Sequence, residues 1–264
     1  MSAVSAPRSL SVIIPALNEE DNLAGAVRTV LDAIGDQFTD YELLIFDDGS
    51  SDRTGQIAEE SAAKNSRIRV VHNHRNLGLG CNYTKGAELA RMEYVAWFPG
   101  DNEVPDQAVR AILGAIGSAE IVVPYISNAH VRSWSRRLIS RSFVHLLNLL
   151  FGLRLQYFNG PSVYSRRLLL SAPIQSSGFA CFAAILIRLI LSGHSYVEIP
   201  IPTGIRQHGR TKAFRVKNLV SIFSTVAGLF WEVHVRDRRK YAAAGQRIEL
   251  PTLSCGSSPI GRKR

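Results

Sequence analysis

Polar and charged side chains follow short apolar runs at four points in the first half of the sequence. The carboxylates among them could hold a hard divalent cation or accept hydrogen bonds from N–H groups of a ligand, and the basic side chains could neutralise an anion. The four clusters are Asn18-Glu19, Asp47-Asp48, His74-Arg75-Asn76 and Asp101-Asn102-Glu103.

These clusters would be positioned by a parallel sheet. In the first 125 residues, short apolar runs alternate with amphipathic stretches, which is typical of strands separated by helices that cover both faces of a sheet. Ligands of such sheets bind at the carboxyl ends of the strands, where the clusters lie. The expected strands are 10–14, 43–46, 68–71, 94–98 and 121–123, and the expected helices begin at an Asn18 cap, at a Ser51 cap, at Gly78 and near Pro105.

The second half of the chain has a different pattern. We expect a basic amphipathic stretch over 134–155, an apolar helix over 179–191, a strand over 196–201 and a helix over 219–231. The last of these has thirteen uncharged residues, whereas a helix that spans a membrane needs about 20. It could lie on a membrane but not cross one alone. From Arg236 on, we expect a basic, disordered tail.

Charge is divided unevenly along the 264 residues. Residues 1–131 carry 10 Lys/Arg and 18 Asp/Glu, a balance of −8, and residues 132–264 carry 21 and 4, a balance of +17. The basic half indicates an anionic partner, which could be nucleic acid, phosphate or a membrane surface. Because no motif with interleaved aromatic residues is present, nucleic acid is not expected. Cys81, Cys181 and Cys255 stand too far apart for a zinc motif or a disulfide framework, which favours the cytoplasm.

Two motifs together resemble the opening of family 2 glycosyltransferases. They are Ser11-Val12-Ile13-Ile14-Pro15-Ala16-Leu17-Asn18-Glu19-Glu20 and Phe46-Asp47-Asp48-Gly49-Ser50-Ser51-Asp52-Arg53-Thr54, followed by Asn76-Leu77-Gly78-Leu79-Gly80 with Lys85-Gly86. Weaker later motifs are similar to the dolichol-phosphate mannose synthase-like branch, which acts on polyprenyl phosphates: Arg137 with Ser140, Gly160…Tyr164-Ser165-Arg166, Gly178-Phe179, Glu198-Ile199-Pro200-Ile201 and Arg206…Gly209…Lys212.

The resemblance implies a GT-A fold, α/β in class, and inverting transfer of a sugar from a nucleotide-diphosphate donor, a UDP- or GDP-sugar. The implied division is an arm (1–9), a catalytic domain (10–215, with a donor half 10–125 and an acceptor half 126–215), an interfacial helix (216–235) and the tail (236–264). Asp48 would bind the base, with Asp47 as the second choice. The alternative is that these acids only cap the next helix, which applies most to Asp52. The implied donor-binding residues are Pro15, Leu17, Asn18, Glu19, Asp47, Asp48, Arg75, Gly78, Lys85, Gly100 and Asn102.

The family's metal motif is altered in this chain. The family places two acids after the fourth strand, whereas Pro99 or Gly100 stands at the position of the first, and Asp101 alone keeps its register. The resemblance implies that Asp101 binds Mg²⁺ or Mn²⁺ and, with Glu103 in support, forms the catalytic centre.

On the acceptor side, the resemblance implies that arginines bind a polyprenyl phosphate, since a guanidinium can contact phosphate oxygens in pairs. The candidates are Arg137, Arg206, Arg210 and Lys212. Ala183 and Ala184 stand where the family usually has an acid, and Gln156 where an Asp is common, which indicates an altered sugar or acceptor pocket. Because the acceptor phosphate is already an anion, it can attack the anomeric carbon of the sugar without a strong general base. The implied location is the cytoplasm or the cytoplasmic face of a membrane, with peripheral association.

Two alternatives stay open. A transferase for a soluble, small-molecule acceptor would also fit the altered acids and the short apolar helices. A catalytically impaired protein that binds anions or lipids would fit Pro99. The stretches 134–155 and 219–231, which would lie in the membrane interface on the first reading, could equally be helices buried in the domain.

Overall fold

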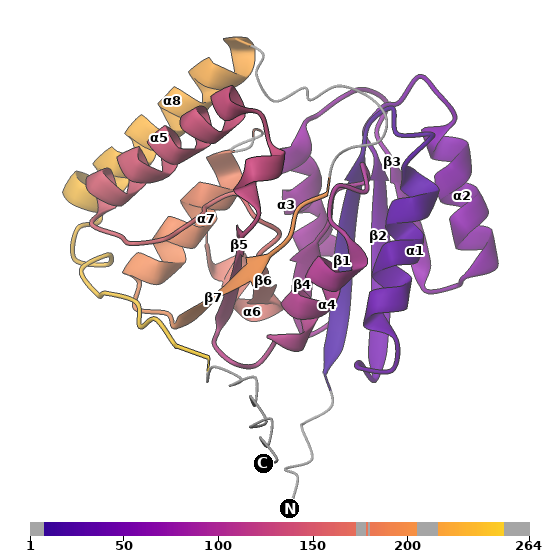
Figure 1. Cartoon of the computed structure of the whole chain (residues 1–264), viewed down its shortest axis with the longest axis horizontal. Helices are drawn as coiled ribbons and strands as arrows, with labels where there is room; N and C mark the ends of the chain where they lie inside the picture. Colours follow the sequence, from indigo (N-terminus) through magenta and orange to yellow (C-terminus); the bar gives the residue numbers. More distant parts are fainter. Residues whose placement is uncertain (1–7, 173–177, 179, 205–215, 251–264) are drawn as a thin grey trace, which may run out of the picture.

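A seven-stranded sheet runs through the computed structural model, which describes residues 8–172, 178, 180–204 and 216–250. Its strand order is β3-β2-β1-β4-β6-β5-β7, and every pairing is parallel except those of β6 with β4 and β5 (Figure 1). The predicted mostly parallel sheet is therefore confirmed. The strands are β1 (Ser9–Ala16), β2 (Asp40–Asp47), β3 (Ile68–His72), β4 (Tyr94–Trp97), β5 (Ile121–Ile126), β6 (Val163–Ser165) and β7 (Tyr196–Ile201).

Helices cover both faces of this sheet (Figure 1). Helices α1, α2 and α4 share one hydrophobic core, and α3, α6 and α7 share the other with parts of α5 and α8. The helices are α1 (Leu23–Ile34), α2 (Thr54–Lys64), α3 (Leu79–Leu89), α4 (Asp106–Gly114), α5 (Trp134–Phe151), α6 (Arg166–Ser171), α7 (Ala180–Leu191) and α8 (Val216–Trp231). A 3₁₀ turn (Ala129–Val131) precedes α5, and a π-helical turn (Glu232–Arg236) follows α8.

Burial on both faces explains why β1 reads as a continuous apolar run. Side chains alternate across a strand. Accordingly, Val12 and Ile14 pack in the core below α1 and α4, whereas Ile13 packs in the opposite core with Tyr83 of α3. All four side chains are fully buried. An apolar run without polar alternation is what a central strand of a two-sided sheet requires.

The strand order places a crevice at the carboxyl end of β1. Chain order runs outward from β1 through β2 to β3 on one side and continues with β4 on the other, so the direction of winding reverses between β1 and β4. Loops that leave two strands at such a point diverge to opposite faces of the sheet and leave room for a ligand. The site is therefore expected where the loops after β1, β2 and β4 meet.

Both predicted helix caps were wrong. Helix α1 begins at Leu23, after Asn22, and α2 begins at Thr54, after Arg53. Asn18 has a positive φ of 52°, and its Oδ1 accepts a hydrogen bond from Ser51 N at 2.8 Å. The amide that resembled a cap therefore ties two loops together, since Asn tolerates the left-handed conformation better than most residues.

The expectation of a disordered tail from Arg236 was wrong for residues 237–250. Residues 246–248 of this segment pair with the first residue of β7, where Tyr196 N donates to Gln246 O and Ile248 N donates to Tyr196 O, and Ala243 forms a bridge with Ser192. Arg247 adds an ion pair of 3.3 Å to the buried Glu198. An edge strand has unpaired backbone groups that a further segment can satisfy, which explains the order of this part of the chain. Residues 251–264, with Cys255, lie outside the described residues.

A buried ion pair fastens α8 to the core. Arg188 of α7 donates to both carboxylate oxygens of Glu232, from Nε at 2.9 Å and from Nη2 at 2.7 Å, and Tyr241 donates to the same carboxylate at 2.7 Å. Chiefly the Arg188 hydrogen bonds lower the pKa of Glu232 to about 2. The stability that this carboxylate contributes is therefore present above its ordinary pKa of 4.5 and is lost as the pH falls from there towards 2.

Replacing Glu232 with Gln is expected to lower the free energy of unfolding at pH 7 by about 3–5 kcal/mol, because the guanidinium of Arg188 would stay buried without a counter-charge. Urea unfolding followed by circular dichroism measures this. The control is Asp237→Asn, which removes only a surface pair with Arg236 and should cost less than about 1 kcal/mol. Equal losses in the two variants would contradict the assignment.

No helix in the described part of the chain is both long and apolar enough to cross a membrane.

Candidate active site

The loops after β1 and β2 are joined by hydrogen bonds between their backbones and polar side chains. Asn18 N donates to Ser50 Oγ at 3.0 Å, and Glu19 N donates to Thr54 Oγ1 at 2.7 Å. Thr54 is in turn held by Asp52, whose Oδ1 accepts from Thr54 N at 3.0 Å. Asp52 therefore acts at the start of α2, as the capping alternative states, and the Ser and Thr residues of the second motif align the two loops.

The loop after β4 lies against the end of β1. Gly100 N donates to Pro15 O at 3.1 Å. A Cβ at position 100 would lie 3.0 Å from Ala16 Cβ and 3.1 Å from Pro15 O, which is tighter than ordinary contact. A side chain at this position would therefore need a shift of a few tenths of an ångström in its neighbours, whereas glycine needs none. This close approach suits Gly100, which with Pro99 is one of the two residues that could stand at the position of the family's first acid.

Asp48 organises the neighbouring loop with its buried carboxylate. Oδ1 accepts from Leu77 N at 2.8 Å and from Asn73 Nδ2 at 3.0 Å, and Oδ2 accepts from Gly78 N at 3.0 Å. Asn73 is itself held by Asn82, whose Oδ1 accepts its second amide hydrogen. Asp48, the acid that the resemblance implies for binding the nucleotide base, therefore fixes the turn that begins α3.

Asp47 faces the other way, towards α2. Its Oδ2 lies 3.0 Å from Nδ1 of His72, and His72 Nε2 lies 2.9 Å from Glu59. The hydrogen bond to Asp47, followed by that to Glu59, raises the pKa of His72. The stabilisation from this bridge is therefore fully present below pH 6.5 and fades as the pH rises through the raised pKa. His72, which the sequence did not single out, braces β2 and β3 against α2.

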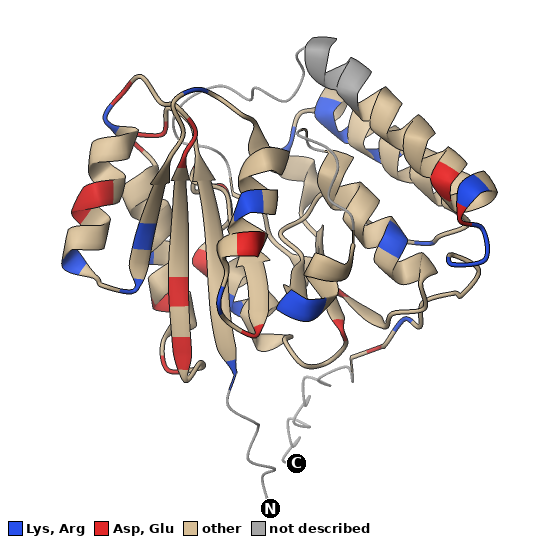
Figure 2. Cartoon of the chain, turned by 180° about the vertical axis from the view of Figure 1, so that it is seen from behind, with Lys and Arg blue, Asp and Glu red and all other residues tan. Residues whose placement is uncertain are grey.

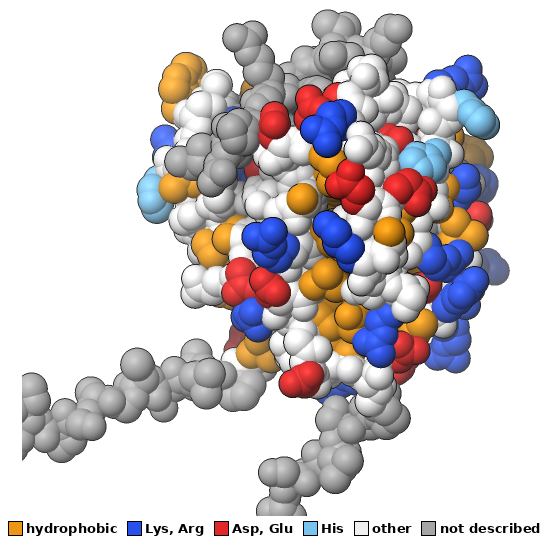
Figure 3. All heavy atoms as spheres, turned by 90° about the vertical axis from the view of Figure 1, so that its right-hand side faces the viewer, with side chains coloured by type: hydrophobic (Ala, Val, Ile, Leu, Met, Phe, Trp, Pro, Cys, Tyr) orange, Lys and Arg blue, Asp and Glu red, His pale blue; other side chains and the backbone are white. Residues whose placement is uncertain are grey.

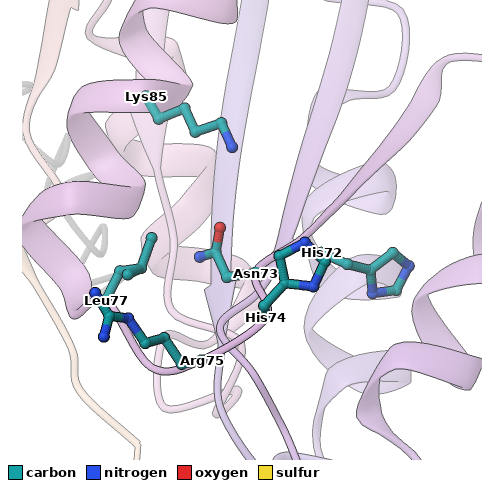
Figure 4. Close-up of a pocket in the computed structure, with 6 residues that line it drawn as sticks. All are labelled: His72, Asn73, His74, Arg75, Leu77 and Lys85. Atoms are coloured by element: carbon teal, nitrogen blue, oxygen red, sulfur yellow. The ribbon is translucent and has the colours of Figure 1, made fainter.

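A hollow of about 380 Å³ opens beside Asp48. Lys85 of α3 points towards the Asn73 amide, whereas the His72 ring points away from them (Figure 4). Gly49 lets the loop after β2 lie directly against the backbone of Arg75, which lines the hollow. It has a φ of 72°, and a Cβ at this position would lie 2.6 Å from the Arg75 backbone. The lining residues are His72, Asn73, His74, Arg75, Leu77 and Lys85. Three of the predicted residues, Arg75, Lys85 and the buried Asp48, thus surround or support one hollow.

Asp101 and Glu103 occupy the turn after β4. Asp101 Oδ1 accepts from Glu103 N at 3.1 Å, and Glu103 Oε2 lies 3.6 Å from Arg136 Nη2 of α5. The carbonyl of Glu103 also accepts from Gly204 N at 2.9 Å. Asn102 Oδ1 accepts from Thr29 of α1 at 3.2 Å and so links this turn to α1, and its role in donor binding stays a prediction.

Of the predicted acceptor residues, only Arg137 lies in the described part of the chain, and Arg206, Arg210 and Lys212 lie outside it. The arginine that reaches the turn after β4 is Arg136, which the sequence analysis missed. Adjacent residues on a helix point about 100° apart, so the choice between Arg136 and Arg137 depends on how α5 is rotated against the sheet. The amphipathic pattern of α5 alone did not determine this rotation.

The acids of the first half do not form one acidic surface. Acidic and basic side chains are interspersed on the face over α1 and α2 (Figure 3). Among the described residues, no group of three or more His, Cys, Asp or Glu side chains could hold a metal ion. Mg²⁺ is commonly bound by one or two carboxylates together with substrate phosphates. Asp101 at the mouth of the crevice fits a cation of this kind, one that a diphosphate helps to bind.

Comparison with known proteins identifies the family of this chain. The model of glycosyl transferase family 2 matches residues 11–186. The polyprenol monophosphomannose synthase of Mycolicibacterium smegmatis is 31% identical, with 76% of this chain and 79% of that protein covered. The undecaprenyl-phosphate 4-deoxy-4-formamido-L-arabinose transferase of Edwardsiella ictaluri is 26% identical over 230 residues, 87% of this chain and 70% of that protein.

The fold is also that of solved enzymes. Glucosyl-3-phosphoglycerate synthase from Mycobacterium tuberculosis, solved with Mn²⁺, UDP and glucosyl-3-phosphoglycerate, superposes with a TM-score of 0.63 at 22% identity, covering 84% of this chain and 80% of that one. The GT-A fold expected from the sequence is confirmed by this likeness. Since the family model extends from β1 into α7 and so includes every loop of the crevice, the chain belongs to glycosyl transferase family 2 and is a glycosyltransferase.

Proposed function

We propose that this glycosyltransferase moves a sugar from a nucleotide-diphosphate donor to a polyprenyl phosphate. The observation that carries the acceptor class is the cation at the turn after β4, Arg136, together with the lack of an acid in α7. Helix α7 places Ala183 and Ala184 where the family usually has an acid, and both are buried in the core. Glu103, the acid next to Asp101, is paired with Arg136. This arrangement suits an acceptor that is already an anion and needs a cationic partner rather than a base.

The donor would lie in the crevice between β1, β2 and β4. Pro15, Leu17, Asn18 and Glu19 would line its β1 side, and Asp48, with Asp47 beside it, would bind the base. Arg75, Gly78 and Lys85 come from the opposite loop and α3, at the hollow of about 380 Å³. Gly100 lets the loop after β4 pack against the end of β1, and Asp101 of that loop would face the donor diphosphate. A bound Mg²⁺ or Mn²⁺ would neutralise the charge that develops on the leaving diphosphate, and Asp101 would hold it.

The reaction is a single displacement. An oxygen of the acceptor phosphate forms a bond to the anomeric carbon as the bond from that carbon to the donor diphosphate breaks, and the nucleoside diphosphate leaves with the electron pair. One displacement inverts the anomeric configuration. Arg136 would hold the acceptor phosphate by charge-assisted hydrogen bonds, with Arg137, Arg206, Arg210 and Lys212 as further candidates. Because such acceptors reside in membranes, the enzyme would work peripherally at the cytoplasmic membrane face.

The test is an assay of UDP- and GDP-sugars, with Mn²⁺ or Mg²⁺, against a short-chain prenyl phosphate and the matching prenol. Transfer to the phosphate but not to the alcohol is expected, with inverted configuration of the product. Equal use of the prenol, or transfer only to soluble hydroxyl acceptors, would refute the acceptor class. Binding of lipid without any donor turnover would instead support an impaired, lipid-binding protein.

Arg136→Lys is the informative variant for the acceptor side. It keeps the charge and loses the paired geometry of the guanidinium, so KM for the prenyl phosphate should rise while KM for the donor stays unchanged. Arg141→Lys, a substitution of the same type at an exposed position further along α5, is the matched control.

A further inference from the structure

Two helices of this protein turn their apolar side chains outward. Of the thirteen large hydrophobic side chains that are exposed in the described residues, nine lie on α5, α8 and the π-helical turn that follows. Phe223, Leu149 and Trp134 are the most exposed, at 77%, 74% and 72%. We call these exposed apolar residues of α5, α8 and the turn the helix-pair surface. An apolar concentration of this kind indicates an interaction site.

The two helices lie side by side on the outside of α7 (Figures 1 and 2). Their carboxyl ends are joined, because the rings of Phe151 and Phe230 are 6.4 Å apart and His234 Nε2 lies 2.8 Å from Leu150 O. No charged residue occurs in α8 from residue 222 to residue 231 (Figure 2). The outward residues of α8 recur at intervals of three or four, as on one face of a helix. The apolar ones are Phe223, Ala227 and Trp231, with Phe230 beside Trp231, and Val235 of the following turn continues the series.

Basic side chains stand at both ends of this pair. One group, at the start of α5, consists of Arg132, Arg136, Arg137 and Arg141, and the other, after α8, consists of Arg236, Arg238, Arg239 and Lys240. The acids of these stretches are Glu232, which is buried on Arg188, and Asp237, which pairs with Arg236. The helix-pair surface therefore carries exposed apolar side chains together with basic ones, which are concentrated in the first half of α5 and after the turn that follows α8.

We propose that the helix-pair surface docks on an anionic lipid bilayer, with its apolar side chains in the interfacial layer and the two basic groups at the lipid phosphates. Apolar side chains facing outward between cations are what a helix lying in a membrane interface requires. Neither helix is long and apolar enough to span the bilayer. A second copy of the chain is a poorer partner, because pairing two such surfaces would bring like charges together.

Docking in this way would also orient the site. The first turns of α5 carry Arg136, which contacts Glu103 beside Asp101. A bilayer against α5 would therefore place the acceptor side of the crevice at the level of the lipid phosphates. This consequence rests on the proposed function, whereas the docking itself does not.

The tryptophans of the chain report on the docking directly. Trp134 and Trp231 belong to the helix-pair surface, and the third, Trp97, is only 6% exposed in the core. Vesicles of phosphatidylcholine and phosphatidylglycerol should shift the fluorescence of the full chain to shorter wavelength, and brominated acyl chains should quench it. Phosphatidylcholine alone should have a much smaller effect. Trp134→Phe and Trp231→Phe should each reduce the lipid-quenched part of the emission, because each removes one of the two tryptophans that contact the bilayer.

A double variant tests the apolar contribution. Leu149→Ser with Phe223→Ser should lower the partition coefficient for the anionic vesicles at least about tenfold, because the variant loses two apolar side chains that would otherwise be transferred from water into the bilayer. Leu170→Ser, at an exposed position of α6, is the matched control and should bind as the unaltered chain does. Sedimentation velocity without lipid shows whether the surface instead joins two copies.

The proposal is overturned if the chain does not bind protein-free anionic vesicles, or if the double variant binds them as tightly as the unaltered chain. It is also overturned if sedimentation velocity shows a dimer that the double variant no longer forms. The double variant should still transfer sugar to a short, water-soluble prenyl phosphate and lose transfer to a long-chain acceptor in vesicles. Vesicle binding with no transfer to either acceptor would refute the proposed function and leave the docking intact.

Discussion

Asp101→Asn is expected to lower kcat/KM for sugar transfer about 100-fold or more, which is the scale of effect seen when an electrostatic group of a catalytic site is lost. Asp101 is the acid that keeps the register of the family's metal motif, and the neighbouring positions hold Pro99 and Gly100. Neither of these neighbours carries a carboxylate, so no adjacent acid replaces Asp101. Asn keeps the shape of the side chain and removes the charge that a divalent cation requires.

Initial rates measured over a series of Mn²⁺ concentrations test this. If Asp101 holds the cation, the variant should need much more Mn²⁺ for half-maximal rate, and excess Mn²⁺ should restore part of the activity. Asp106→Asn is the matched control, because Asp106 is the exposed partner of Arg110 at the start of α4 and should leave the rate unchanged. A variant of Asp101 with unaltered rates and metal dependence would refute the metal assignment.

The elements were predictable where a local pattern has one physical solution. The strand at 196–201 was predicted with its observed bounds, and α7, described over 180–191, lies within the expected 179–191 and ends at the same residue. Both are nearly continuous apolar segments, and burial of such segments determines their place in the core. Helix starts were less predictable, because Asn18 and Ser51 can either cap a helix or join two loops. Only the distance between those loops decides between the two roles.

The site was predictable in its strand-end positions and not in its side-chain partners. That Asp48 and the loop at 75–78 would share one site follows from sheet order. That the Asp48 carboxylate holds Leu77 N and Gly78 N does not, because it depends on the path of the loop after β3. Arg136 was missed for a similar reason, since the rotation of α5 is set by packing. The structure of the segment 237–250 was not predicted, because the segment is held by backbone hydrogen bonds to Tyr196 of β7. Backbone hydrogen bonds cannot be recognised from amino-acid composition.

Asp48→Ala is expected to abolish donor binding at accessible concentrations and to lower the free energy of unfolding by about 2–4 kcal/mol. The substitution leaves the backbone N–H groups of Leu77 and Gly78 and one hydrogen of Asn73 without their acceptor, and buried donors without partners cost about 1–3 kcal/mol each. The turn that begins α3 would relax partly into water, which offsets some of this cost. Because the same turn leads to Lys85, the hollow beside it would lose its shape.

Calorimetric titration with UDP and GDP measures the loss of binding, and urea unfolding measures the loss of stability. Glu60→Ala, on α2, is the control, since it removes only an exposed hydrogen bond with Gln56 and should cost about 0.5 kcal/mol or less with no change in nucleotide affinity. Asp48→Asn separates the two roles of Asp48. Asn keeps one acceptor oxygen for the turn and lacks the charge, so it should recover part of the stability and little of the affinity. Recovery of both would mean that Asp48 builds the loop and does not itself bind the base.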